Sequence, residues 1–234
     1  MTSLFSPGCA LMIYKPVLAQ KTLRFLQSSL GQVDMHLTCC HYDPGLAPGT
    51  QIINTCPGCD KRFGSLYEGV TTISLWEVLA NSKDFLFPDY RGKKMTILDA
   101  CPTRNERRVH DAIRTLLSRM NIVVTEPGKT REKGTCCGDS FYGVLPIENV
   151  KEQMQKRAAE MPEPDVVVYC VSCVKAIATG GKQPRYLVDL LFNEETLGGQ
   201  PDLDQWHQDI DSFKLAHGSE NLSNFAINTK TILL

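Results

Sequence analysis

The sequence contains no long hydrophobic run and no excess of charge of either sign. No stretch approaches the roughly 18 apolar residues that a membrane-spanning helix requires. The N-terminal segment, residues 1–8, has neither a basic region nor a long apolar region, so we expect no secretory signal and a cytoplasmic protein. The 25 basic and 26 acidic residues nearly cancel, which argues against a protein that binds the phosphate backbone of nucleic acids.

Motifs for the common organic redox cofactors are also missing. The sequence has no GxGxxG motif, no flavin signature and no ferredoxin-type run of four closely spaced cysteines. We therefore expect neither NAD nor flavin in this chain. With 234 residues, 42% of them hydrophobic, the chain can bury one large core or two small ones.

Cysteine, in contrast, is abundant and regularly placed. In the reducing cytosol, clustered cysteines are more often metal ligands or redox groups than structural disulfides. Each half of the chain contains one cysteine, then an adjacent pair, then a CxxC motif, and no cysteine is left over. The first set is Cys9, Cys39, Cys40, Cys56 and Cys59, and the second set is Cys101, Cys136, Cys137, Cys170 and Cys173.

The segments around the cysteines repeat as well, which indicates an internal duplication. An apolar run precedes the first cysteine of each half, and a helical pattern follows it, at residues 17–30 and 109–120. We expect Gly31 and Asn121 to end these helices. A β-branched run leads to each CxxC, and amphipathic helices are predicted at residues 73–79 and 185–191.

This order predicts an α/β protein made of two pseudo-symmetric repeats of a small Rossmann-like unit. We expect the first repeat at residues 1–92, the second at 93–195, and a linker and C-terminal tail at 196–234, with a weak helix at about 203–215. The first cysteine and the CxxC of each repeat are expected just after the carboxyl ends of strands, where such sheets bind ligands. Helix N-termini at that edge favour the thiolate form of cysteine.

Five thiolates in each half suggest a polynuclear site. A structural zinc ion takes four ligands, and an ordinary [4Fe–4S] or [2Fe–2S] cluster takes four cysteines. A zinc site would leave one cysteine unused in each half, at matching positions. A cluster in which one thiolate bridges two irons would use all five, so the count favours an unusual cluster and leaves zinc open.

The pattern C…CC…CxxC, with Thr135-Cys136-Cys137-Gly138 in the second half, resembles the cysteine-rich CCG domain. Two such domains in one chain resemble the B subunit of heterodisulfide reductase and related stand-alone iron–sulfur proteins. The resemblance covers residues 1–195 and implies two non-cubane [4Fe–4S] clusters, one on each set of five cysteines. It also implies that a disulfide substrate is reduced in a cleft between the clusters.

The first half departs from this family pattern in two ways. Its cysteine pair is followed by His41 instead of glycine, and only 15 residues separate the pair from the CxxC, against 32 in the second half. The longer gap holds a predicted helix from Pro146 to about Glu160, whereas residues 43–49 of the first half read as a turn-rich loop. The first site is therefore expected to be more open, and zinc could replace one of the clusters.

Basic residues near the motifs are candidates to offset the negative charge of such sites. The strongest is Arg104, three residues after Cys101, which is a candidate contact for the cluster or for a substrate carboxylate. His41 is more readily a neighbour of the first site than a ligand, and we place His110 on the protein surface. Trp76 and Tyr186 are expected in the core. The other basic candidates are Lys15, Lys61, Arg62, Arg107, Arg108 and Lys175.

Three functions fit these observations. The first is an iron–sulfur oxidoreductase that reduces a small disulfide or related thiol substrate with electrons from a ferredoxin or a ferredoxin-like subunit. The second is a non-catalytic iron–sulfur subunit for electron relay or redox sensing. The third is an interaction protein stapled by zinc.

Overall fold

The computed structural model describes residues 2–198 and 202–218. These residues form two compact units, whose boundaries in the sequence lie between Ile73 and Ser74 and between Leu203 and Asp204. This division differs from the expected ranges of 1–92 and 93–195. Residues 74–92 belong to the second unit because their helix packs against a helix of that unit, and residues 204–218 belong to the first unit.

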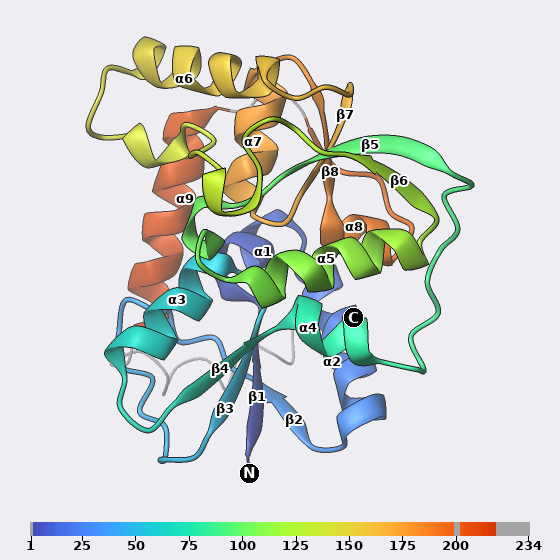
Figure 1. Ribbon diagram of the computed structural model, residues 1–234. Coiled ribbons are helices and arrows are strands. Elements are labelled where there is room, and N and C mark those ends of the chain that lie inside the picture. Colours follow the sequence, from blue (N-terminus) through green and yellow to red (C-terminus); the bar gives the residue numbers. More distant parts are fainter. Residues whose placement is uncertain (1, 199–201, 219–234) are drawn as a thin grey trace. The chain divides into compact units, whose positions relative to one another are not determined.

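The first unit is a four-stranded sheet with the strand order β2-β1-β3-β4, flanked by helices (Figure 1). Strand β1 pairs in parallel with both β2 and β3. The elements are β1 (Ser3–Ser6), α1 (Gly8–Tyr14), α2 (Pro16–Leu30), β2 (Val33–Met35), β3 (Gln51–Asn54), α3 (Pro57–Leu66), β4 (Thr71–Ser74) and, from the C-terminal part of the chain, α9 (Leu203–Ala216).

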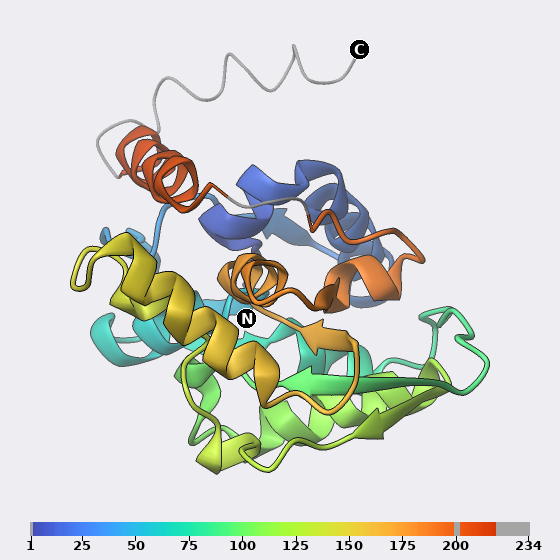
Figure 2. The same ribbon diagram turned by 90° about the horizontal axis from the view of Figure 1, so that it is seen from above.

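The second unit repeats this order as β6-β5-β7-β8, and every strand pair in it is parallel. Its helices α6 and α7 lie side by side, as Figure 2 shows from above. The elements are α4 (Leu75–Asn81), β5 (Lys93–Leu98), α5 (Arg107–Arg119), β6 (Ile122–Thr125), α6 (Ile147–Ala159), β7 (Asp165–Val168), α7 (Val171–Thr179), β8 (Gln183–Tyr186) and α8 (Leu187–Leu191), with short 3-10 helices at Cys101–Thr103, Arg131–Lys133 and Asp139–Phe141.

Hydrophobic periodicity explains the layers of each unit. The three consecutive valines of β7, residues 166–168, are all fully buried, as expected for a central parallel strand that is covered on both faces. Helix α5 buries the stripe formed by Val109, Ile113, Leu116 and Leu117 and exposes its charged face. The protein is therefore α/β, with two Rossmann-like units, as the sequence predicts.

The predicted helix positions are mostly confirmed. Helix α2 ends at Leu30, and Gly31 follows with a φ of +85°, while Asn121 has a φ of +54° two residues after α5 ends. Both positive φ values stop a right-handed helix. The helix predicted from Pro146 is α6, the loop at 43–49 contains no helix or strand, and the predicted helix near the C-terminus is α9.

Two predicted helices begin later than expected. Residues 185–186 belong to β8, because Pro184 and Tyr186 are buried and Arg185 is partly exposed, an alternation that suits a strand paired with β7. Likewise, residue 73 belongs to β4. Ser74 then caps α4, and its side chain accepts a hydrogen bond from the Glu77 N–H in a capping box.

The strand order indicates where each sheet is expected to bind a ligand. In the order β2-β1-β3-β4 the chain first winds to one side of β1 and then crosses to the other, so the switch point lies between β1 and β3. Ligands of open α/β sheets bind outside the carboxyl ends of the strands at this point. The second unit has the same switch point between β5 and β7.

Within the described residues, no helix combines the length and the apolar character needed to cross a membrane. The expected linker at 194–202 is only partly described, because residues 199–201 lie outside the described ranges. The last part of the expected tail, residues 219–234, also lies outside them.

Candidate thiol sites

The five cysteines of the first unit come from three loops at one edge of its sheet. Cys9 lies in the first turn of α1, directly after β1, and the pair Cys39-Cys40 lies in the loop after β2. Cys56 is the N-cap of α3, directly after β3, and Cys59 lies in the first turn of that helix. Strands β2, β1 and β3 are neighbours, so the sheet brings the three loops together.

Gly8 allows the closest approach between two of these loops. Its φ is +74°, and a Cβ atom at this position would lie 2.9 Å from Cys56 Cβ and 3.3 Å from Cys59 Sγ. Both the left-handed backbone and the crowding exclude a side chain here. The turn between β1 and α1 is thereby held against the CxxC motif.

The five thiols form one continuous chain of contacts. Cys9 is hydrogen-bonded to Cys39, Cys39 to Cys40, Cys40 to Cys59, and Cys59 to Cys56. All five cysteines are free thiols, and none is paired in a disulfide. The adjacent pair therefore joins the single cysteine on one side to the CxxC on the other.

The second unit repeats this chain of contacts in the same order. Cys101 is hydrogen-bonded to Cys136, Cys136 to Cys137, Cys137 to Cys173, and Cys173 to Cys170. These cysteines are also free, and they follow β5, β6 and β7 as their counterparts follow β1, β2 and β3. The prediction that the first cysteine and the CxxC of each repeat lie just after the carboxyl ends of strands is thus confirmed.

The contacts divide the thiols into acceptors and donors. In the first unit, the thiols of Cys40 and Cys9 donate to Cys39 and lower its pKa to about 2. Cys40, which donates to Cys39, has its pKa raised to about 12, and the pKa of Cys9 is raised further by the same cause. The favoured anion is therefore the first cysteine of the adjacent pair.

The same position is the anion in the second unit. Contacts from the thiols of Cys101 and Cys137 lower the pKa of Cys136 far below its ordinary value. Ser140 Oγ lies 2.9 Å from this sulfur, and the Gly138 N–H donates to it over 3.4 Å. The contacts thus favour the anion at the matching residue of both units.

Helix α3 also favours a thiolate at its N-cap residue, Cys56. The Cys59 thiol and the backbone N–H groups of Cys59 and Gly58 donate to the Cys56 sulfur and lower its pKa to about 7, although burial opposes this. Orphan N–H groups at a helix N-terminus stabilise an anion in this way.

The donor set fits thiophilic metals, but the described residues contain no ready-made site for a single ion. No group of three or more His, Cys, Asp or Glu side chains in residues 2–198 and 202–218 has the geometry of such a site. The sulfur atoms instead contact one another. Binding of a metal centre would replace these S–H···S contacts with metal–sulfur bonds.

A small enclosed cavity lies beside the first set of cysteines, and one of the residues that line it has a polar atom without a hydrogen-bond partner. The cavity is lined by Cys9, Cys39, Cys40 and Cys59, and its accessible volume of about 10 Å³ has room for roughly one water molecule. Nε2 of His36, which lines the same cavity, is buried without a hydrogen-bond partner. Burial also lowers the pKa of His36 to about 4, so the ring is neutral. This histidine was not among the sequence candidates.

His41 stands where the second set has Gly138, and it makes the same backbone contact. The His41 N–H donates to the Cys39 sulfur, as the Gly138 N–H does to Cys136. The imidazole is solvent-exposed, and partial burial together with the nearby Arg62 lowers its pKa. His41 therefore contributes to the first site through its backbone N–H group, and its imidazole faces the solvent.

Arg62 and Tyr67 support the main chain of the cysteine pair. Arg62 Nε donates to the Cys40 carbonyl over 3.2 Å. The hydroxyl of Tyr67 is shared between the carbonyls of Cys40, at 3.2 Å, and Tyr42, at 2.7 Å. Arg62 thus positions the loop that carries the pair.

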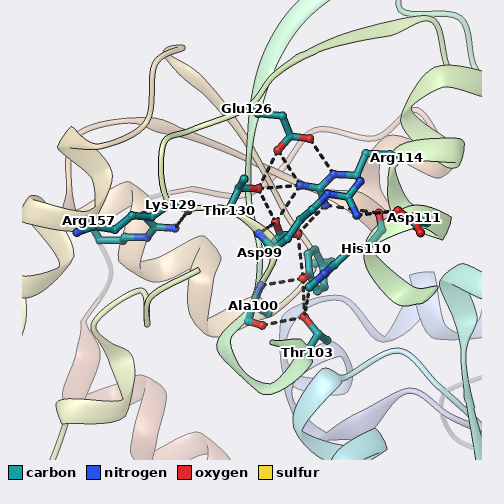
Figure 3. A network of polar contacts seen from close by, with 12 residues as sticks. Asp99, Ala100, Thr103, His110, Asp111, Arg114, Glu126, Lys129, Thr130 and Arg157 are labelled. Carbon is teal, nitrogen blue, oxygen red and sulfur yellow. Dashed lines mark hydrogen bonds and ion pairs between the residues drawn. The ribbon is translucent and has the colours of Figure 1, made fainter. Parts of the chain in front are cut away.

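Behind the second site lies a buried polar network that the sequence analysis missed (Figure 3). Arg114 makes a bidentate ion pair with Asp99, at 2.7 and 2.8 Å, and also binds Glu126. Burial raises the pKa of Asp99, but the hydrogen bonds from Arg114 and from the Arg131 N–H outweigh it and set the pKa at about 2. Asp99 lies two residues before Cys101, so the ion pair anchors the end of β5.

Tyr169 links this network to two of the three cysteine loops of the second unit, those of Cys101 and Cys170. Its hydroxyl accepts a 2.8 Å hydrogen bond from the Ala100 N–H and lies 2.8 Å from Thr103 Oγ1 and 3.3 Å from Asp99. Ala100 immediately precedes Cys101, and Tyr169 itself immediately precedes Cys170. The hydroxyl therefore fixes the spacing between the two loops.

The prediction that His110 lies on the surface is wrong. The side chain is only 1% exposed, and its Nε2 lies 3.2 Å from Thr103 Oγ1 (Figure 3). The helical period explains the error, because position 110 faces the polar network behind β5 and not the solvent. Trp76 and Tyr186 are buried, as predicted.

Arg104 is exposed, and its Nε donates to the Gly134 carbonyl over 3.3 Å. It lines an open concave surface with a volume of about 580 Å³, together with Arg107, Arg131 and Asp111. Arg107 and Arg131 both pair with Asp111, at 3.8 and 2.6 Å. This surface begins at the helical turn that contains Cys101.

The remaining basic candidates make other contacts or are exposed. Arg108 forms a 3.7 Å ion pair with Glu77, and the ammonium group of Lys15 lies 5.5 Å from the centre of the Tyr14 ring. Lys61 is exposed and Lys175 is half-buried. Arg107 and Arg108 lie on the exposed face of α5.

Comparisons with known proteins add little at this point. No family model and no curated protein matches the chain. A solved structure of Picrophilus torridus aspartate racemase is similar, with 12% sequence identity and a TM-score of 0.33 over 82% of this chain and 92% of that one. A similarity of this size gives no guide to the chemistry of the site.

The C-terminal helix supplies contacts to the first site that the sequence analysis also missed. Phe213 lines the cavity beside the cysteines, and the Cys39 N–H donates to the His217 carbonyl over 3.1 Å. No motif marks these residues, because they lie more than 150 positions from the cysteines that they contact.

Proposed function

We propose that this chain is an iron–sulfur oxidoreductase of the heterodisulfide reductase B type. In this proposal each set of five cysteines holds a non-cubane [4Fe–4S] cluster, and the protein reduces a small disulfide. The observation that carries the proposal is that the same chain of four contacts among five thiols recurs, in the same order, at the carboxyl edges of two equivalent sheets.

The number and types of the donors support iron and sulfide over a single zinc ion. Four thiolates complete a tetrahedral zinc site, and a fifth in direct contact with them would carry no bond to the metal. Here the fifth thiol is joined to the others in both units, which favours a centre with several metal ions. The buried network behind the second site supplies rigid support for its loops.

The reaction consumes one disulfide, two electrons and two protons and yields two thiols. The clusters would supply one-electron transfer, and a reduced ferredoxin or a ferredoxin-like subunit would supply the electrons. Arg104 and its concave surface would bind an anionic part of the substrate, because the guanidinium group is exposed and three residues from Cys101.

A second candidate function follows from the small cavity of the first unit. With room for roughly one water, this cavity has no space for a disulfide beside the first set of cysteines. That feature favours electron relay or redox sensing at the first site, with any substrate chemistry confined to the second.

The test begins with metal analysis. The full chain, purified anaerobically or reconstituted with ferrous iron and sulfide, is expected to bind about eight iron and eight sulfide ions if both sites carry four-iron clusters. Cys40→Ala and Cys137→Ala should each lose about half of the iron, and each variant serves as the control for the other. Zinc without acid-labile sulfide would reject the proposal and favour a zinc-stapled protein.

The activity is tested separately. With chemically reduced ferredoxin as donor, the loaded protein should release two thiols for each disulfide consumed. Arg104→Gln should raise the KM for a carboxylate-bearing disulfide more than for an uncharged one. Clusters that form but reduce no disulfide with any donor would leave electron relay as the function.

A further inference from the structure

The first unit lacks a helix that the second unit has next to its cysteine pair. Between the pair and the CxxC lie 15 residues in the first unit and 32 in the second. The longer segment contains the 13 residues of α6, whereas the shorter one is a loop. The loop of the first unit therefore has no helix of its own to cover the turn that follows the cysteine pair.

In the second unit, α6 packs directly on the turn that follows the cysteine pair. A Cβ atom at Gly138 would lie 2.7 Å from Met154 Cγ and 2.9 Å from the Met154 backbone nitrogen. Met154 is buried, and α6 also packs along α7, the helix that begins at the CxxC. Helix α6 is therefore a wall behind two of the three cysteine loops.

In the first unit, the end of α9 contacts the corresponding turn. The Cys39 N–H donates to the His217 carbonyl, and a Cβ atom at Gly218 would lie 3.2 Å from the ring of Tyr42. Phe213, one turn earlier, lines the cavity beside the thiols. Its ring is stacked on that of His217, with the centroids 3.8 Å apart and the planes at 9°.

We propose that α9 replaces, from the far end of the sequence, the wall that α6 provides in the second unit. Phe213 closes the first thiol site against solvent. This role does not depend on which metal binds.

The closure is tested by alkylation of the reduced, metal-free full chain, with the modified cysteines identified by mass spectrometry. Phe213→Ala should raise the alkylation rates of the first five cysteines on the order of tenfold, because loss of the ring opens the cavity. The rates for the second five should stay unchanged. Leu215→Ala is the matched control, because Leu215 lies on the same helix with 69% of its surface exposed.

Two results would overturn the closure. One is a Phe213→Ala protein whose first five cysteines stay as protected as in the parent. The other is an equal rise in all ten rates in a variant that keeps the circular dichroism of the parent, because the ring would then not protect the first site in particular. Circular dichroism of each variant separates general unfolding from local opening.

Failure to bind iron would reject the proposed function, yet the alkylation results would still decide whether α9 closes the first site.

Discussion

Gly138 lies so close to Met154 that no side chain fits between them. A Cβ atom on residue 138 would approach Met154 Cγ to 2.7 Å, and the φ of +113° is one that L-residues rarely adopt. Glycine thus follows the second cysteine pair because α6 packs on the turn. His41 can follow the first pair because no helix from the adjoining loop approaches it.

This difference predicts opposite responses to substitution at two equivalent positions. Gly138→Ala should reduce the free energy of unfolding by about 2–4 kcal/mol, because it combines overpacking with backbone strain. His41→Gly, at an exposed position, should cost less than about 1 kcal/mol. Urea unfolding of the reduced, metal-free protein measures both, and equal costs would contradict the explanation.

The close approach of Gly8 to the CxxC of the first unit gives a second prediction. Gly8→Ala should displace the turn between β1 and α1 and weaken Zn²⁺ binding by the first unit, because its Cβ would meet Cys56 at 2.9 Å. We expect a loss of about tenfold or more in affinity, which corresponds to about 1.4 kcal/mol.

Gly92 provides the control for this substitution. It has the same φ of +74°, but no atom lies within 4 Å of the position that a Cβ would occupy. Gly92→Ala should therefore show the backbone strain of about 1 kcal/mol without a change in metal affinity. If both variants bind Zn²⁺ equally well, crowding at Gly8 does not shape the site.

Tyr169 is expected to affect the second site through its hydroxyl. Tyr169→Phe leaves the buried Ala100 N–H without its 2.8 Å partner, which should cost about 1–3 kcal/mol of stability. Because this N–H lies next to Cys101, Zn²⁺ release from the second unit should also become faster. Tyr90→Phe removes a 2.9 Å hydrogen bond to the Leu190 carbonyl, away from the cysteines, and should lower stability alone.

Asp99 gives a prediction for low pH. Its ordinary pKa of 3.8 is lowered to about 2 in the folded protein, so the ion pair with Arg114 stabilises the fold fully above about pH 4. This contribution, about 2 kcal/mol, is lost as the pH falls through 2. In Asp99→Asn, the decline in stability between pH 4 and pH 2 should be correspondingly shallower.

Urea unfolding at several pH values measures this effect in the metal-free protein. Asp34→Asn, which changes an exposed carboxylate on β2, should keep the parent's decline. An Asp99→Asn protein that loses stability as steeply as the parent would show that another group titrates in this range.

The sequence analysis located the cysteines correctly because their positions follow from local signals. Apolar runs and the spacing of the CxxC motifs place the first cysteine and the CxxC of each half just after a strand, and the parallel strand order then brings the loops together. The start of β8 was missed because Arg185 and Tyr186 continue a helical pattern. Only pairing with β7 turns residues 183–186 into a strand.

By itself, the sequence determined the duplicated α/β fold, the two sets of five cysteines and the short gap of the first set, since these depend on residue types and spacing. Tertiary structure decided which groups surround the sulfur atoms. The end of α9 reaches Cys39, the Tyr169 hydroxyl reaches Ala100, and Arg114 reaches Asp99 through packing between segments that are distant in the sequence. Residue types and their spacing in the sequence do not reveal such contacts, because these depend on how strands and helices pack against one another.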